Sequence, residues 1–214
     1  MRFTDNTNQR GLLKELKGDF YNLRKMVGEP VTHFLDIGGN VGMVSIAARF
    51  LFPGVKIHTY EPCKKTYSVL ARNVKGLGIE IFNEGLVHEA SVNAPNYLHI
   101  SQRTSGCTFS DSNPEGGIPF KCASFAEMIE RMGGEVFLPH TILKVDCEGA
   151  ENALFTANAI ESLKKCKHFV AELHTKTDTE MCDRFKLLQW LFKSVDYKQW
   201  GRPGRVRANV YCHH

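Results

Sequence analysis

Three carboxylates follow an apolar run within one short stretch of the chain, Thr141 to Asn152, which reads TILKVDCEGAEN. The apolar run Ile142 to Val145 is typical of a buried strand, and Asp146, Glu148 and Glu151 come directly after it. An unpaired charge at the end of a buried strand is unfavourable unless a partner compensates it. We therefore expect a cation or a polar ligand at Asp146 and Glu148, and a helix-dipole role for Glu151.

A second group of polar residues lies in AELHTK, where Glu172 and His174 are two positions apart and share one face of an extended strand. A histidine beside carboxylates can take the proton of a hydroxyl that acts as a nucleophile. We expect Asp146, Glu148, Glu172 and His174 to be catalytic. The alternative for the histidine is a hydrogen bond to a loop carbonyl. Asp146 and Glu172 are also the oxygen ligands to be expected if the site binds a divalent metal ion.

A glycine-rich turn connects a predicted strand to a predicted helix in FLDIGGNVGMVSIAA. Asp36 ends the strand, and Gly38, Gly39 and Gly42 let backbone amides at the helix N-terminus approach a ligand closely. Glu61 follows in HTYEP, at the end of the next predicted strand, where a carboxylate can accept both hydroxyls of an adenosine ribose. The pattern predicts a nucleotide-type pocket rather than a plain tight turn.

The charge of the pocket indicates which nucleotide it binds. A pyrophosphate would meet the carboxylate of Asp36, and the sequence supplies neither the GxGxxG spacing nor a Walker lysine. S-adenosylmethionine carries an ammonium and a sulfonium group, which suit Asp36 and Glu61. Its carboxylate can bind the amides near Asn40 to Gly42. We expect S-adenosylmethionine to be the cofactor.

Strands and helices alternate along the chain, which predicts an α/β fold with a largely parallel sheet. Strands are expected at 32–37, 55–60, 79–82, 142–145, 168–173, 194–200 and 205–212, and helices at 41–52, 64–74, 124–132, 151–165 and 179–192. Two short strands are expected at 97–100 and 118–122, around an irregular stretch. No repeat or linker interrupts the pattern, so we expect one domain over residues 1–214, with an N-terminal helical extension at 1–29 and a substrate loop at 101–117.

The motifs FLDIGGNVG, YEP, LKVDCEGAE and VAELH, in this order and spacing, resemble the FkbM family of S-adenosylmethionine-dependent methyltransferases, which are class I and Rossmann-like. The resemblance covers roughly residues 30 to 175. It implies a seven-stranded sheet in the order 3-2-1-4-5-7-6 with the last strand antiparallel and helices on both faces. It also implies methylation of an oxygen, often a hydroxyl of a sugar or of another small molecule. The cofactor-binding residues implied are Asp36, Gly38, Gly39, Asn40, Gly42, Glu61 and Pro62.

Composition sets broad limits on the protein. The chain has 214 residues, 43% of them hydrophobic, and a formal net charge of +4, which by itself demands no anionic partner. Its 7 cysteines include no CxxC pair, so reduced thiols are expected rather than zinc or disulfides. The N-terminal MRFTDNTNQR has no apolar signal region and no apolar run is long enough for a membrane span, which favours a cytoplasmic protein without a membrane partner.

Two other functions stay open at this stage. RNA methylation, at a cap or a ribose 2'-oxygen, is suggested by basic residues that could surround the aromatic Trp200, namely Lys164, Lys165, Lys167, Arg202, Arg205 and Arg207. The lysine-aspartate-lysine-glutamate tetrad of such enzymes is not evident, because Lys144 is expected to alternate away from Asp146. The other alternative is a non-catalytic binding protein that retains the fold.

Overall fold

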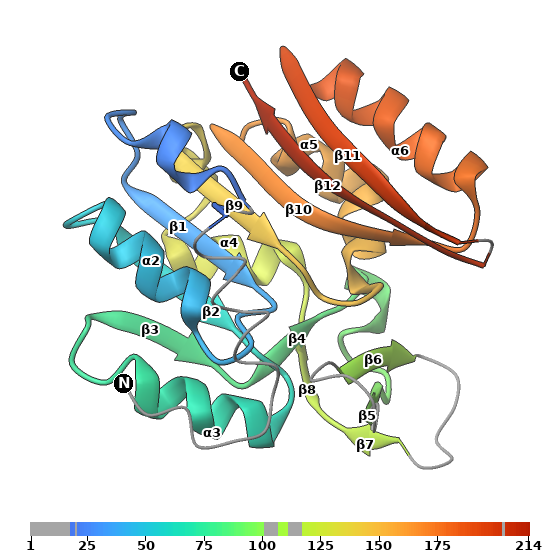
Figure 1. Cartoon of the computed structure of the whole chain (residues 1–214). Helices are drawn as coiled ribbons and strands as arrows, with labels where there is room; N and C mark the ends of the chain where they lie inside the picture. Colours follow the sequence, from blue (N-terminus) through green and yellow to red (C-terminus); the bar gives the residue numbers. More distant parts are fainter. Residues whose placement is uncertain (1–17, 20, 101–106, 111–116, 203) are drawn as a thin grey trace.

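Seven strands form the central sheet of the molecule, in the spatial order β11-β12-β10-β9-β1-β2-β3 (Figure 1). The structure is a computed structural model that describes residues 18–19, 21–100, 107–110, 117–202 and 204–214. The strands of this sheet are β1 (His33–Ile37), β2 (Lys56–Tyr60), β3 (Ile79–Phe82), β9 (Thr141–Val145), β10 (His168–Thr175), β11 (Ser194–Arg202) and β12 (Arg205–His213).

Numbering these seven strands along the chain gives the order 3-2-1-4-5-7-6, as predicted. The pairs β1–β2, β1–β9, β2–β3 and β9–β10 are parallel. β12 is antiparallel to β10, from His168 opposite His213 to Thr175 opposite Val206. The sheet therefore has the Rossmann-like topology, and the carboxyl ends of β1, β2, β9 and β10 meet at one edge, where such sheets bind ligands.

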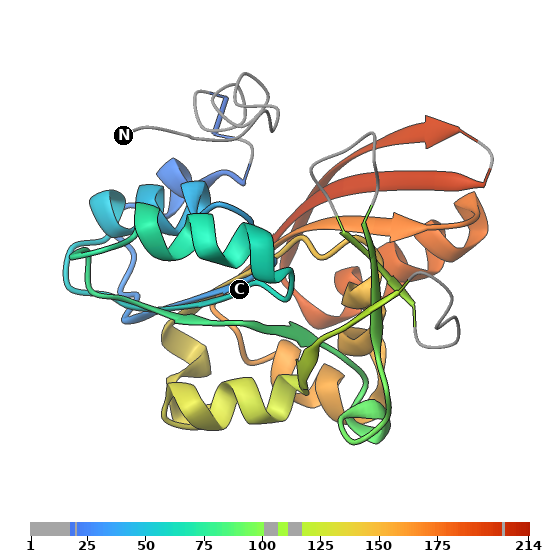
Figure 2. The same cartoon turned by 90° about the horizontal axis from the view of Figure 1, so that it is seen from below.

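Helices cover both faces of the sheet (Figure 2). Side chains alternate along each strand. On β1, Leu35 and Ile37 pack in the cluster that includes α4 and α6, whereas Phe34 packs in the cluster that includes η1 and α2. Asp36 has the same parity as Phe34, so it faces the side of α2. Glu172, which has the parity of Val170 on β10, faces that side too.

The helices lie close to the predicted ranges, with one exception. They are η1 (Leu23–Met26), α2 (Met43–Leu51), α3 (Lys64–Asn73), η2 (Glu89–Ser91), α4 (Phe125–Met132), η3 (Glu135–His140), η4 (Ala150–Phe155), α5 (Ala157–Leu163) and α6 (Asp178–Leu191). A single helix over 151–165 was the wrong expectation. Thr156 is extended and caps α5 through its side chain, which accepts from the amide of Ala159, so the segment divides into a 3₁₀ turn and a short α-helix.

Two small sheets lie beyond the central one (Figure 1). β4 (Glu84–Leu86) pairs in parallel with β8 (Lys121–Ala123), and β5 (Tyr97–Ile100) pairs antiparallel with β6 (Cys107–Ser110) and β7 (Ile118–Pro119). The segment 101–117 is therefore not one irregular loop, because β6 lies within it. Residues 101–106 and 111–116 are outside the described residues, so the rest of the expected substrate loop is not placed.

The part of the N-terminal extension that is described does not form a continuous helix. Asp19 and Asn22 have positive φ values of 49° and 54°, and only the single 3₁₀ turn η1 follows them. Residues 1–17 and 20 lie outside the described residues. In the part of the chain that the structure describes, no helix has the length and apolar character needed to cross a membrane. The cysteines at 63, 122, 147, 166, 182 and 212 form no disulfide bond with another described residue.

Candidate active site at the carboxyl edge of the sheet

The glycine-rich turn is packed directly against the end of β9. Gly38 and Gly39 both donate their amides to the carbonyl oxygen of Tyr60, at 3.0 and 2.9 Å. Gly38 has a φ of +83°, and a Cβ there would lie 1.8 Å from the carbonyl oxygen of Asp146. Only glycine fits this position, which brings the ends of β1 and β9 together.

Asp36 lies beneath this turn and is fully buried. The Nζ of Lys144 lies 2.9 Å from Asp36 Oδ1, and the hydroxyl of Ser45 donates to Oδ2 at 2.5 Å. Lys144 also donates to the carbonyl of Gly38 at 2.7 Å. Burial disfavours the charge on Lys144, but the carboxylates of Asp36 and Asp146 outweigh burial and raise its pKa. Lys144 and Ser45 are therefore the neighbours of the Asp36 carboxylate, and the expected contact of Asp36 with a cofactor stays a prediction.

Glu61 lies beside the turn, where two backbone amides hold its carboxylate. Its Oε2 accepts from the amide of Asn40 at 3.0 Å and its Oε1 from the amide of Cys63 at 2.9 Å. Each oxygen of a carboxylate has a second lone pair, so two further donors can bind there. Burial raises the pKa of Glu61 to about 7, against the effect of these two amides. Asn83 fixes the backbone after it by donating to the carbonyls of Glu61 and Pro62.

Two further features of the turn suit a polar ligand. Asn40 has a positive φ of 48°, and its Oδ1 is buried without a hydrogen-bond partner among the described residues. Gly42, at φ +90°, precedes α2 and has no side chain to cap the first amides of that helix. Free amides at a helix N-terminus bind carboxylates well. The turn therefore offers an acceptor and a set of donors next to Glu61.

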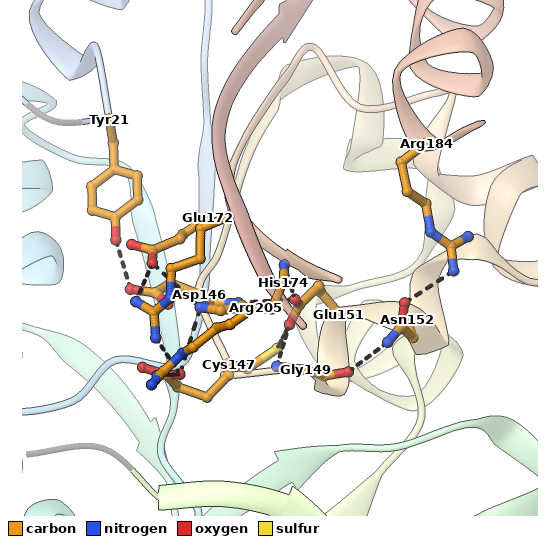
Figure 3. Close-up of polar contacts among 12 residues, drawn as sticks. Tyr21, Asp146, Cys147, Gly149, Glu151, Asn152, Glu172, His174, Arg184 and Arg205 are labelled. Carbon is orange, nitrogen blue, oxygen red and sulfur yellow. Dashed lines mark hydrogen bonds and ion pairs between the residues drawn. The ribbon is translucent and has the colours of Figure 1, made fainter. Parts of the chain in front are cut away.

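Asp146 lies just beyond β9, at the centre of the polar residues in Figure 3. Its amide donates to the carbonyl of Ile37 at 3.0 Å, and its Oδ2 accepts from the hydroxyl of Tyr21 at 2.8 Å. Burial is the main cause that raises the pKa of Asp146 to about 6, while Lys144 acts in the opposite direction. β9 ends at Val145, as predicted, so Asp146 and Glu148 lie beyond the strand.

His174 lies among three carboxylates at the end of β10 (Figure 3). Its Nδ1 is 2.9 Å from Glu151 Oε1, and its Nε2 is 3.3 Å from Glu172 Oε1 and 3.5 Å from Glu148 Oε2. Burial works against the charged ring, but the hydrogen bonds to Glu151 and Glu172 outweigh it and raise the pKa of His174 to about 10. With this pKa the His174 ring is charged at neutral pH, and the expected catalytic role of His174 stays a prediction.

Glu151 does more than complement a helix dipole. It is buried, and its carboxylate accepts from the amides of Gly149 and His174, at 2.8 and 2.6 Å, as well as from the His174 ring. Glu148 and Gly149 have φ values of 51° and 107°, which turn the chain sharply after β9. The expected dipole role for Glu151 was therefore incomplete, because its carboxylate ties this turn to β10.

Arg207 on β12 bridges two of the predicted catalytic carboxylates. It donates to Glu172 Oε1 at 2.7 Å and to Glu148 Oε2 at 3.1 Å, and Arg205 lies 3.8 Å from Glu148. Although burial opposes it, the cations His174 and Arg207 lower the pKa of Glu172. No group of three or more potential ligands in the described chain has the arrangement of a metal site. The partners of Glu172 and Glu148 in the structure are therefore cationic side chains.

The structure brings together the predicted residues at one edge of the sheet and adds others that the sequence did not suggest. Tyr21 was missed because it lies far away in sequence. Lys144 was missed because it was expected to alternate away from Asp146, which was wrong, since residues two positions apart on a strand share a face. Lys144 is opposite Asp36 in the register of β1 and β9, so both side chains lie on the same face. This pairing is the signal that could have identified Lys144. Nothing in the sequence near Tyr21 indicated its contact.

The topology and this edge of glycines and carboxylates define a Rossmann-like methyltransferase fold. Residues 36–198 match the model of the methyltransferase FkbM domain, which is well over half of the chain. The chain therefore belongs to the FkbM methyltransferase family. A comparison with curated proteins gave no match.

Two solved structures are similar to this chain at low sequence identity. The methyltransferase domain of METTL16 is 9% identical with a TM-score of 0.54, and the match covers 94% of this chain and 67% of that one. An FkbM methyltransferase from Methylobacillus flagellatus KT is 12% identical with a TM-score of 0.49, and the match covers 85% of this chain and 44% of that one. At these identities the likeness concerns the fold alone.

Proposed function

We propose that this protein transfers a methyl group from S-adenosylmethionine to a hydroxyl oxygen of a small molecule or a saccharide. The observation that carries the proposal is the carboxylate of Glu61, fixed by two backbone amides beside a glycine-rich turn, with one lone pair left on each oxygen. This arrangement suits the two hydroxyls of a ribose. We further propose that residues 1–214 act as one domain, which is supported by the single sheet that strands from both halves of the chain build.

The other polar groups of the turn fit the amino-acid part of S-adenosylmethionine. The first amides of α2 suit its carboxylate, and Asn40 Oδ1, which is buried without a partner among the described residues, suits a donor of the ligand. In this proposal Asp36 supports the turn and does not contact the cofactor itself, because Lys144 and Ser45 lie against its two carboxylate oxygens. When bound, S-adenosylmethionine supplies a methyl group on a sulfonium centre that attracts the nearby carboxylates.

Asp146 is the base that we propose for the reaction. The acceptor oxygen forms its bond to the methyl carbon as the carbon–sulfur bond breaks, and the hydroxyl proton passes to Asp146. Its pKa of about 6 makes it ionised, yet still basic, at neutral pH. His174, with its pKa of about 10, is instead a cation whose Nε2 lies 3.3 Å from Glu172 Oε1 and 3.5 Å from Glu148 Oε2.

Calorimetric titration with S-adenosylmethionine and its product S-adenosylhomocysteine tests the first step. We expect saturable binding with one site per chain, weakened by Glu61→Ala and unaffected by Glu130→Ala, which alters an exposed residue of α4 on the opposite face. No binding at millimolar concentration would overturn the proposal. Binding without any transfer to a broad set of hydroxylated compounds would support the non-catalytic alternative.

The methyl-transfer assay, run with and without a chelator, tests whether the site uses a divalent metal ion. We expect the rate of methyl transfer to be unchanged by a chelator, because Arg207 and His174 already supply positive charge to Glu172. A rate that falls with the chelator and returns with Mg²⁺ would assign Asp146 and Glu172 to a metal ion instead.

RNA methylation receives less support from the arrangement of the charges. The three lysines lie at the start of β10, whereas Arg205 and Arg207 lie beside its end. An eight-residue strand spans about 25 Å, so the two groups do not form one surface around Trp200. Five of these six basic residues also have a carboxylate partner, and the pairs are Lys164–Glu161, Lys165–Glu135, Lys167–Glu29, Arg205–Glu148 and Arg207–Glu148. Lys144, paired with Asp36, is not available for a tetrad.

A further inference from the structure

Tyr21 lies before the first strand, yet its side chain reaches the centre of the candidate site. The match to the FkbM domain begins at residue 36, so Tyr21 is outside it. Its hydroxyl donates to Asp146 Oδ2 at 2.8 Å across 125 positions of sequence. In Figure 3 the ring descends from the N-terminal segment and points its hydroxyl at Asp146.

Packing and a tight turn hold Tyr21 in this place. Its ring is 7% exposed and belongs to the apolar cluster that contains Met26 of η1 and Phe34 of β1. The amide of Asn22 donates to the carbonyl of Asp19 at 2.7 Å, and both residues have positive φ values, 54° and 49°. This turn directs the side chain toward the sheet. The contact with Asp146 is therefore made by an ordered, buried residue.

Tyr21 touches both of the charged groups that meet at the ends of β1 and β9. The Nζ of Lys144 lies 5.3 Å from the centre of the Tyr21 ring, within the range of a cation–π interaction. The hydroxyl binds one oxygen of Asp146, and no described residue donates to the other oxygen, Oδ1. An uncharged donor on one oxygen orients a carboxylate without neutralising it.

We propose that Tyr21 is a positioning residue for methyl transfer, which holds Asp146 by Oδ2 so that Oδ1 faces the acceptor hydroxyl. This inference rests on the proposed function, in which Asp146 is the base. Other groups also act on Asp146: burial and Glu172 raise its pKa, and Lys144, Tyr21 and His174 lower it. The hydroxyl of Tyr21 thus favours the ionised form that accepts a proton.

Tyr21→Phe tests the inference because it removes only the hydroxyl. We expect the acidic limb of the pH profile of kcat to move upward by about one unit, with a KM for the acceptor within about twofold of wild type. If the limb moves from about 6 to about 7, the rate at pH 5.5 falls about eightfold and the rate at pH 8.5 changes by less than about twofold. A loss that is equal at all pH values, or an unchanged limb, would overturn the inference.

Tyr211→Phe is the matched control. Tyr211 belongs to the same apolar cluster and is equally buried, but its hydroxyl lies near His168, at the opposite end of β10. We expect this variant to keep the wild-type pH profile. If the wild type transfers no methyl group, the proposed function fails; if it does and both tyrosine variants behave alike, the inference about Tyr21 fails alone.

A measurement that needs no turnover covers the case in which Tyr21→Phe is less stable. The free energies of unfolding of Tyr21→Phe, Asp146→Asn and the double variant form a double-mutant cycle. We expect the two substitutions to be non-additive at pH 8, where Asp146 is ionised, and additive within error at pH 4.5. Additivity at both pH values would show that the hydroxyl does not stabilise the carboxylate, contrary to the proposal.

Discussion

Asp146 and His174 illustrate how position decides the role of a titratable side chain. Asp146 is half-buried just after a strand with only a few compensating groups, and burial raises its pKa to about 6. His174 is half-buried too, but the carboxylates around it outweigh burial and raise its pKa to about 10. The carboxylate is therefore the group that can exchange a proton near neutral pH, and the histidine keeps its charge.

The pH dependence of the reaction follows from these two values. Asp146 must be unprotonated to act as a base, so kcat should rise as the pH increases through about 6, and His174 should cause no change below about pH 9. Asp146→Asn should lower kcat by about 10² to 10⁴-fold, the usual effect of removing a general base, while binding of S-adenosylhomocysteine stays within about threefold. Steady-state kinetics measures kcat, and calorimetry measures the affinity for S-adenosylhomocysteine.

Asp196→Asn serves as the control for this prediction, because Asp196 is a 65% exposed residue of β11 whose ion pair with Lys25 lies at the surface. Equal losses of kcat in the two variants would contradict the assignment of Asp146. The assignment would also be contradicted if kcat of the wild type rose with pH around a pKa far from 6.

Glu61 should give the binding of the cofactor its own pH dependence. The ribose hydroxyls donate to the ionised carboxylate, and burial raises the pKa of Glu61 to about 7. A proton therefore competes with the ligand, and affinity should fall as the pH decreases through 7. For a pKa of about 7 the loss between pH 8 and pH 6 is about tenfold.

Calorimetric titration with S-adenosylhomocysteine at several pH values measures this effect. Glu61→Gln should bind more weakly at pH 8 and should lose most of the dependence on pH, whereas Glu130→Gln, an exposed residue of α4, should retain it. An affinity of the wild type that does not change between pH 6 and pH 8 would show that Glu61 is not the ribose ligand.

Among the elements, β1 and β9 depend on a buried ion pair between them. Lys144 and Asp36 are 2% and 0% exposed and lie opposite each other in the strand register. Removing one member leaves a buried charge without its partner, which typically destabilises a protein by about 3 to 5 kcal/mol. Lys144→Met should therefore lower the free energy of unfolding by about that amount, as measured by urea denaturation.

A second variant separates the charge from the packing. Asp36→Asn combined with Lys144→Met removes both charges and should recover part of the lost stability. Lys186→Met breaks the exposed pair with Asp183, whose side chains are 76% and 67% exposed, and should leave stability unchanged. A small effect of Lys144→Met alone would mean that water reaches Asp36, and the buried pair would not be what holds the turn.

Strands and helices could be predicted where the sequence has a regular apolar pattern. They could not be predicted where a single local hydrogen bond or strand pairing ends or adds an element. Alternation of apolar strands and amphipathic helices predicted the seven strands, and the family resemblance implied their order in the sheet. The break at Thr156 depends on one hydroxyl that caps α5, and β6 depends on its pairing with β5. Neither contact has a periodic signature.

The residues of the site could be predicted where they lie at the ends of the parallel strands. Parallel strands bring the acids after β1, β2, β9 and β10 to one edge, so Asp36, Glu61, Asp146 and Glu172 were placed in the correct region. Their partners come from elsewhere: Tyr21 from the N-terminal segment and Arg207 from the antiparallel β12. Contacts between residues so far apart in sequence can be identified only in the folded structure. They decide which carboxylates already have a charged partner.

At the scale of the whole molecule, the positions of the charges bear on the class of acceptor. Proteins that bind RNA through its backbone gather basic side chains on one surface, and their affinity falls steeply with salt. Here the lysines before β10 and the arginines beside its end are separated by the length of that strand. These two described groups of basic side chains therefore do not form one surface around Trp200.

This distribution predicts weak, non-specific binding of RNA. A 20-nucleotide single strand should bind with a Kd no tighter than about 10⁻⁶ M at physiological salt, the range of non-specific association. Lys165→Gln and Lys167→Gln should leave both this affinity and methyl transfer to the small hydroxylated acceptor unchanged, because these lysines pair with Glu135 and Glu29 far from Asp146. Fluorescence anisotropy over a salt series measures the binding. A Kd near 10⁻⁸ M with a steep dependence on salt, together with methyl transfer to that strand, would make RNA the acceptor and overturn the small-molecule proposal.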